Sequence, residues 1–120
     1  MTEAEVKAFL REGGYPDHLV KGGSKGLIER WDAFVSEVER GYSLHLEDYR
    51  NDLDLRAIIS RLGMQADVEE IDQRLRACLV FSAESVWDCE DFPDAFWLYG
   101  YPRNARGELR EDLQAEGFIE

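Results

Sequence analysis

Apolar residues recur along much of the chain at the spacing of an amphipathic α-helix. The clearest run stands at i, i+4, i+7, i+8 and i+11 and consists of Leu27, Trp31, Phe34, Val35 and Val38. This spacing puts five apolar side chains on one helix face. Ser24 is a good N-cap and Gly41 a good stop, so we predict a helix between them. We interpret its opposite face as ordinary solvated surface, formed by Glu29, Arg30, Glu37 and Arg40.

A further helix is predicted at the start of the chain. Thr2 and Glu5 have the spacing of a capping box, in which each side chain bonds the backbone N–H of the other residue. Gly13 and Gly14 end this helix. Residues 18–21 can then form one short helical turn before Gly22 and Gly23.

Residues 44–62 carry two apolar stripes on nearly opposite sides of a helix. The first stripe consists of Leu46, Tyr49 and Leu53, and the second of Leu55, Ile58, Ile59 and Leu62. Either the helix breaks near Asn51 and Asp52, or one continuous helix is buried on two sides. We favour the continuous helix, because this stretch contains no glycine or proline.

Two more helices are predicted in the second half of the chain. One begins near Asp67, where Asp67 and Glu70 give a cap signal, and continues to about Phe81. The other spans residues 105–115, with Asn104 as its N-cap.

The segment 77–102 is rich in both acidic and aromatic residues. It contains half of the aromatic residues of the chain and five carboxylates but no Lys or Arg. Residues 96–99 can form a short strand, and we expect irregular structure elsewhere in this segment.

Together these patterns predict one domain over residues 1–120 with an all-α fold. We expect a bundle of four to five helices and an irregular, aromatic-rich segment near the C-terminus. The residues expected inside the core are Trp31, Phe34, Val38, Ile59, Leu62, Ile71 and Leu75.

The charge of the chain narrows the possible partners. There are 26 acidic and 14 basic residues, which gives a net charge of −12. Such a charge disfavours nucleic acids and anionic membranes and attracts a basic protein. No run approaches the roughly 20 apolar residues of a membrane span, and the first residues do not resemble a signal peptide. With only Cys78 and Cys89 and no disulfide framework, we expect a cytoplasmic protein.

The acidic and aromatic segment is the first candidate site. Large aromatic anchors within a charged rim are typical of protein interfaces. The residues expected to contact a partner are Asp88, Glu90, Asp91, Asp94, Trp97 and Tyr99. Alternatively, the rings only cap the core and the carboxylates keep the segment solvated. The carboxylates do not have the spacing of an EF-hand, so a metal loop is the weaker interpretation here.

The second candidate site lies in the predicted helix 44–62. Asp48, Asn51 and Asp52 stand at i, i+3 and i+4, and Asp48 and Asp52 could hold Mg²⁺. The structural alternative is that Asp52 pairs with Arg56 one turn later.

Three other features are given structural interpretations. His18 and His45 have no ligand spacing and are expected in a loop or at a helix cap. Residues 22–26 are glycine-rich and could bind an anion at a helix N-terminus, but they do not have the order of a P-loop. The arginines after residue 102 are expected to neutralise the acidic segment before them; they are Arg103, Arg106 and Arg110.

Two classes of function follow from these observations. The first is a small acidic binding protein without catalytic activity or cofactor, of the inhibitor, antitoxin or immunity type, whose partner is a basic protein. The second is a small enzyme or ligand-binding domain that uses Asp48, Asn51 and Asp52 with a divalent ion. An enzyme of this kind requires a concave pocket in which these side chains converge.

Overall fold

The computed structural model describes residues 2–81 and 95–119. This part of the chain contains five α-helices, namely α1 (Glu3–Glu12), α2 (Asp17–Arg40), α3 (Leu46–Arg61), α4 (Glu69–Cys78) and α5 (Gly107–Ala115). It also contains two 3-10 turns, η1 (Gln65–Val68) and η2 (Phe96–Tyr99), and two short strands, β1 (Leu79–Phe81) and β2 (Gly100–Pro102). The predicted all-α fold is confirmed.

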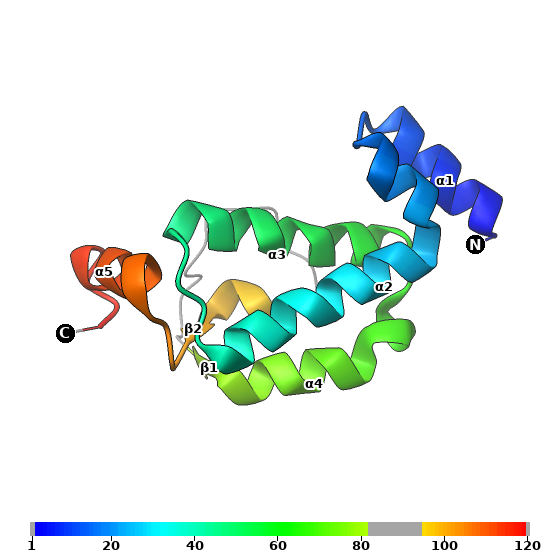
Figure 1. Cartoon of the computed structure of the whole chain (residues 1–120). Coiled ribbons are helices and arrows are strands. Elements are labelled where there is room, and N and C mark those ends of the chain that lie inside the picture. Colours follow the sequence, from blue (N-terminus) through cyan, green and yellow to red (C-terminus); the bar gives the residue numbers. More distant parts are fainter. Residues whose placement is uncertain (1, 82–94, 120) are drawn as a thin grey trace.

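The helix α2 is central to the arrangement. It packs against α1, α3 and α4, and α5 packs against α3. Because α1 and α5 lie at opposite ends, the molecule is long, with extents of 47 × 26 × 23 Å (Figure 1). No helix in the described ranges is long and apolar enough to cross a membrane.

The predicted core residues lie between α2, α3 and α4. Six of the seven are buried, namely Trp31, Phe34, Val38, Ile59, Leu62 and Leu75. The seventh, Ile71, is only partly buried and packs against the core. The helical spacing of the apolar residues therefore identified the buried face of each long helix.

The continuous helix expected over residues 44–62 is confirmed as α3. Tyr49 and Leu53 of its first stripe are buried, and so are Ile58 and Ile59 of its second stripe. Burial on both sides is possible because α3 has helix neighbours on more than one side, α2 and α5. A helix with two apolar stripes needs such neighbours on both sides.

The start of α2 differs from the prediction. We expected a helix from Ser24 and a separate turn before it, but the two are joined through Gly23, which has φ 58° and ψ −149°. This backbone conformation is open almost only to glycine. The backbone N–H of Ser24 donates to Oε1 of Glu3 at 2.9 Å, and the Ser24 hydroxyl donates to the other oxygen. Glu3 of α1 therefore satisfies the free N–H at the point where α2 resumes.

The second half of the chain departs from the predicted boundaries. α4 begins at Glu69 after η1, so the expected cap at Asp67 is wrong. It ends at Cys78, because residues 79–81 pair with residues 100–102 in an antiparallel ladder. The strand expected at 96–99 is instead a 3-10 turn, and the strand follows it.

The N-cap predicted for the last helix is also wrong. α5 begins at Gly107 with Arg106 at the N-cap position. Asn104 does not reach this helix and instead donates from Nδ2 to the carbonyl of Glu39 at 2.9 Å. Because its side chain bonds this distant carbonyl, Asn104 does not act as the N-cap of α5.

Candidate functional site

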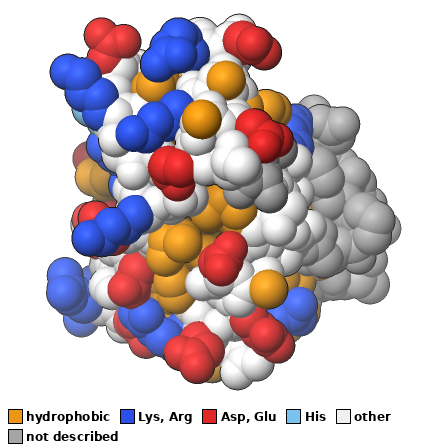
Figure 2. All heavy atoms as spheres, turned by 90° about the vertical axis from the view of Figure 1, so that its right-hand side faces the viewer, with side chains coloured by type: hydrophobic (Ala, Val, Ile, Leu, Met, Phe, Trp, Pro, Cys, Tyr) orange, Lys and Arg blue, Asp and Glu red, His pale blue; other side chains and the backbone are white. Residues whose placement is uncertain are grey.

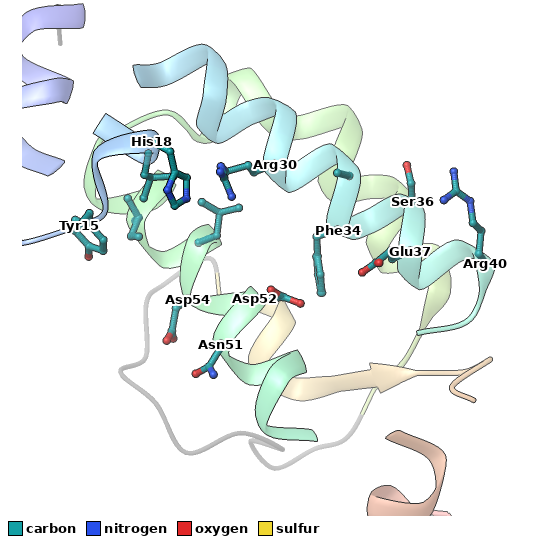
Figure 3. A pocket seen from close by; sticks show the side chains of 14 residues that line it. Tyr15, His18, Arg30, Phe34, Ser36, Glu37, Arg40, Asn51, Asp52 and Asp54 are labelled. Atoms are coloured by element: carbon teal, nitrogen blue, oxygen red, sulfur yellow. The ribbon is translucent and has the colours of Figure 1, made fainter. Parts of the chain in front are cut away.

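A groove of about 710 Å³ lies between α2 and α3. Its apolar lining consists of Leu19, Ala33, Phe34, Leu55 and Ile58. Its polar lining consists of Tyr15, His18, Arg30, Ser36, Glu37, Arg40, Asn51, Asp52 and Asp54. Figure 3 shows Phe34 projecting from α2 toward α3, with Asp52 on the other side of the groove. The groove thus combines an apolar interior with charged groups on both sides.

The face of α2 that was predicted to be solvated is exposed, at Glu29, Arg30, Glu37 and Arg40. Three of these residues, Arg30, Glu37 and Arg40, also line the groove. Exposed Ala33, which lies between them in the sequence, lines the groove as well. The sequence alone does not show this groove, because its other wall is formed by α3.

Asp52 is the most distinctive polar group of the groove. It is half-buried, and its Oδ2 accepts a hydrogen bond from the hydroxyl of buried Tyr42 at 2.6 Å. Burial raises the pKa of Asp52, the Tyr42 hydrogen bond opposes this rise, and the negative charge of Asp48 adds to it. No Lys or Arg of the described ranges forms an ion pair with Asp52. A carboxylate that is partly buried without a cation is a functional-site candidate.

The hydroxyl of Tyr42 stays protonated beside this carboxylate. Burial raises the pKa of Tyr42 well above its ordinary value, and the hydrogen bond to Asp52 raises it further. Tyr42 is therefore a fixed donor that holds the orientation of the Asp52 carboxylate.

The residues of the predicted metal site do not converge. Asn51 and Asp52 line the groove, whereas Asp48 accepts from the backbone N–H of His45 at 3.2 Å. Nowhere in residues 2–81 and 95–119 do three or more His, Cys, Asp or Glu side chains form a group that could hold a metal ion. The trio is thus split between a helix cap and the groove.

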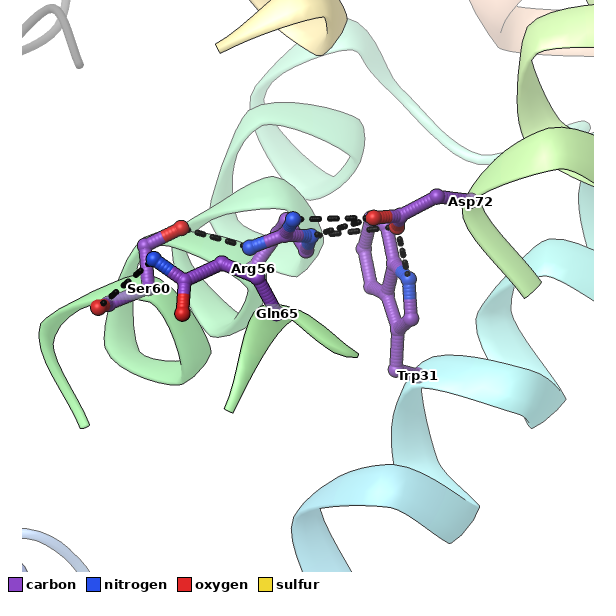
Figure 4. A network of polar contacts seen from close by, with 5 residues as sticks. All are labelled: Trp31, Arg56, Ser60, Gln65 and Asp72. Atoms are coloured by element: carbon purple, nitrogen blue, oxygen red, sulfur yellow. Dashed lines mark hydrogen bonds and ion pairs between the residues drawn. The ribbon is translucent and has the colours of Figure 1, made fainter. Parts of the chain in front are cut away.

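The predicted pairing of Asp52 with Arg56 is wrong. Arg56 is 2% exposed and faces α4, where its Nε and Nη2 donate to the carboxylate of Asp72 at 2.8 to 3.1 Å. The same carboxylate accepts from Nε1 of Trp31 at 2.9 Å, and Nη1 of Arg56 donates to Ser60 (Figure 4). The ring of Trp97 lies 4.7 Å from the guanidinium carbon. Tertiary packing has therefore overridden the local i, i+4 rule.

Most of the predicted partner-binding residues lie outside the described structure. These are Asp88, Glu90, Asp91 and Asp94. Of the two others, Trp97 is 1% exposed and packs beneath Arg56, and Tyr99 is partly buried. Contact of this segment with a partner stays a prediction.

The remaining candidate groups have structural partners. His45 precedes α3 and lies between the carboxylates of Glu108 and Asp112 on α5. The glycine-rich segment 22–26 holds the chain's own Glu3 carboxylate at Ser24. Arg103 donates to two backbone carbonyls of residues 77 and 79.

The chain matches no model of a known family, no curated protein and no solved structure. The groove between α2 and α3 is therefore the basis for assigning a function.

Proposed function

We propose that this protein is a non-enzymatic, cytoplasmic binding protein of the inhibitor, antitoxin or immunity type. Its partner is a basic protein, and a segment of that partner lies in the groove between α2 and α3. The observation that carries this proposal is Asp52, a half-buried carboxylate held by Tyr42 in an open groove, without an ion-pair partner in the described structure. A basic segment supplies the missing charge.

The dimensions of the groove suit a short peptide segment. Its α2 wall extends from Arg30 to Arg40, which corresponds to about 15 Å at the rise of an α-helix. This length accommodates roughly three turns of a helix or about five extended residues. The apolar interior offers burial for aliphatic side chains, and the charged walls fix the register of the segment.

One face of the molecule has the composition of an interface. On the side of the molecule that carries α1, hydrophobic side chains gather in a hollow bordered by charged ones (Figure 2). A stable protein interface buries about 800 Å² on each partner, more than the groove alone offers, so such borders contribute the rim. The net charge of −12 accelerates the encounter with a basic protein.

The proposal is tested by blocking the groove. Ala33→Trp places a large ring at an exposed position of the groove wall, and Ala115→Trp makes the same change on exposed α5 surface outside it. Both variants and the parent chain are used for affinity capture from lysate of the source cells. The captured proteins are identified by mass spectrometry, purified and measured by calorimetry.

We expect a basic partner that binds the parent chain and the Ala115→Trp control equally. The same partner loses at least roughly tenfold in affinity with Ala33→Trp, because filling a groove removes the anchor contacts. The proposal fails if every captured partner binds Ala33→Trp as tightly as the parent. It also fails if the partner that depends on the groove is acidic.

A further inference from the structure

We infer that the Asp52 end of the groove is a subsite for the guanidinium group of an arginine side chain. This inference rests on the proposed function and names the chemical group that the groove selects. It follows from a comparison of two carboxylates that lie on either side of the same aromatic cluster.

The first carboxylate, Asp72, shows how this fold binds a guanidinium group. Asp72 accepts one hydrogen bond from an aromatic side chain, the Nε1–H of Trp31, at 2.9 Å. It also accepts the Nε and Nη2 donors of Arg56, whose guanidinium carbon is 4.7 Å from the centre of the Trp97 ring. The arrangement therefore has three parts: an oriented carboxylate, a neutral aromatic donor, and a guanidinium group over a ring.

The second carboxylate, Asp52, has the same parts except for the guanidinium group. Its aromatic donor is the Tyr42 hydroxyl at 2.6 Å, and the ring is that of Phe34, which lines the groove. Phe34 stacks on Trp31 with centroids 5.1 Å apart and meets the edge of Tyr42 at 5.8 Å. Asp72 and Asp52 are thus joined through one row of aromatic rings, with an arginine bound at only one of them.

Two arginines of the chain, Arg30 and Arg40, line the same groove, but neither forms an ion pair with Asp52 in the described structure. Residues 82–94, which lie outside the described structure, contain no Lys or Arg. Arg56, one helical turn after Asp52, is fully engaged with Asp72 and Ser60. The cation for Asp52 is therefore expected from another molecule.

The groove favours guanidinium over ammonium. A planar guanidinium group can donate to both oxygens of Asp52 while it contacts the part of Phe34 that lines the groove. The compact ammonium group of lysine does not stack and keeps more of its hydration. The lining also holds the carboxylates of Glu37 and Asp54, the positive charges of Arg30 and Arg40, and the side-chain oxygen of Asn51, which is a further acceptor.

The test is a titration of the isotope-labelled full chain, monitored by NMR at constant ionic strength. The probes are the acetylated amides of arginine, lysine and citrulline. Citrulline has nearly the shape of arginine but no charge. We expect saturable shifts of the backbone amides around Asp52 and Phe34 with arginine in the millimolar range, roughly threefold weaker binding of lysine and none of citrulline.

Three variants test whether arginine binding depends on Asp52 itself or only on the negative charge of the groove. Asp52→Asn is expected to weaken arginine binding at least roughly tenfold, whereas Asp54→Asn, which removes the same charge from the same groove, changes it less than roughly twofold. Tyr42→Phe keeps the ring but removes the donor, and it is expected to weaken arginine binding roughly threefold. The spectra themselves report whether each variant is folded.

The inference is overturned if arginine causes no saturable shift, if citrulline binds equally well, or if Asp52→Asn and Asp54→Asn behave alike. These outcomes leave the proposed function standing as long as a basic partner still depends on the groove in the Ala33→Trp experiment. Loss of that dependence refutes both.

Discussion

The indole Nε1 of Trp31 and the Oδ1 of Asp72 lie 2.9 Å apart in the buried centre of the protein. Trp31 belongs to α2 and Asp72 to α4, and Arg56 of α3 completes the contact. One carboxylate thus connects the three helices that enclose the core. Its loss affects their relative placement as well as a single hydrogen bond.

Replacing this carboxylate is expected to destabilise the fold strongly. Asp72→Asn leaves the buried Arg56 guanidinium without its counter-charge, which costs about 3–5 kcal/mol in the free energy of unfolding. The matched control is Asp32→Asn, which breaks the more exposed pair between Asp32 and Arg74 at 2.6 Å. There we expect a loss of about 1 kcal/mol or less. Urea denaturation measures both values, and similar losses for the two variants would contradict this account of Asp72.

Gly23 is expected to tolerate no side chain. Gly23→Ala would place a Cβ atom 1.7 Å from Oε1 of Glu3, in a backbone conformation with φ 58°. We expect a loss of stability of about 1–3 kcal/mol from backbone strain, together with loss of the Glu3 contact. Gly26→Ala is the control, because nothing lies within 4 Å of its added Cβ. This helical substitution should stabilise by about 0.5–1 kcal/mol. Thermal melting of the two variants should therefore shift in opposite directions.

His45 makes the docking of α5 dependent on pH. Its Nε2 lies 2.9 Å from Glu108 and its Nδ1 3.1 Å from Asp112, so only the doubly protonated ring can donate to both. The hydrogen bond to Asp112 is the main cause that raises the pKa of His45, with the charges of Glu108 and Asp48 adding to it and slight burial opposing it. Glu47, Arg50 and Glu116 line the same small hollow.

The sign of the effect follows from the direction of this shift. Since the pKa is raised in the folded state, the stabilisation is fully present below the unfolded value of about 6.5 and is lost as pH rises through the folded value. His45→Gln should therefore melt at a lower temperature than the parent in mildly acidic buffer and at nearly the same temperature at alkaline pH. The difference should shrink with added salt, because the pair is exposed. A difference that grows with rising pH would refute the assignment.

Two regions of negative charge should affect partner binding differently. Charge reversal at the acidic positions of the 77–102 segment, namely Asp88, Glu90, Asp91 and Asp94, is expected to slow association and flatten its salt dependence. Asp52→Asn is expected to act mainly on dissociation, because it removes a contact made only in the complex. Stopped-flow kinetics with the identified partner distinguishes the two. Unchanged association after charge reversal would exclude the segment as a steering surface.

Local patterns predicted the helices better than the contacts between them. The stripe from Leu27 to Val38 and the glycine stops depend on residues close in sequence, so α1, the part of α2 after Gly23 and the continuous α3 followed from periodicity. The end of α4 did not, because β1 is fixed by pairing with residues 100–102. Strand partners that lie about twenty residues apart leave little trace in either segment alone.

The candidate site was predictable only in part. Asn51 and Asp52 were identified because polar residues interrupt an apolar stripe, and both line the groove. The partner of Asp52 was missed because Tyr42 is ten positions away across a turn. The choice of Arg56 between Asp52 and Asp72 depends on which side of α3 faces α4, and no local rule contains that information.

Gly23 divides α2 into two helical parts, and residues from both parts line the groove. Tyr15, His18 and Leu19 at one end of the groove precede Gly23, while the residues of both walls follow it. A ligand that touches both parts therefore spans the bend at Gly23, which the contact of Glu3 with Ser24 supports. Linkage makes the two contacts mutually dependent: a ligand that binds this arrangement of α2 protects the contact between Glu3 and Ser24, and that contact favours the ligand.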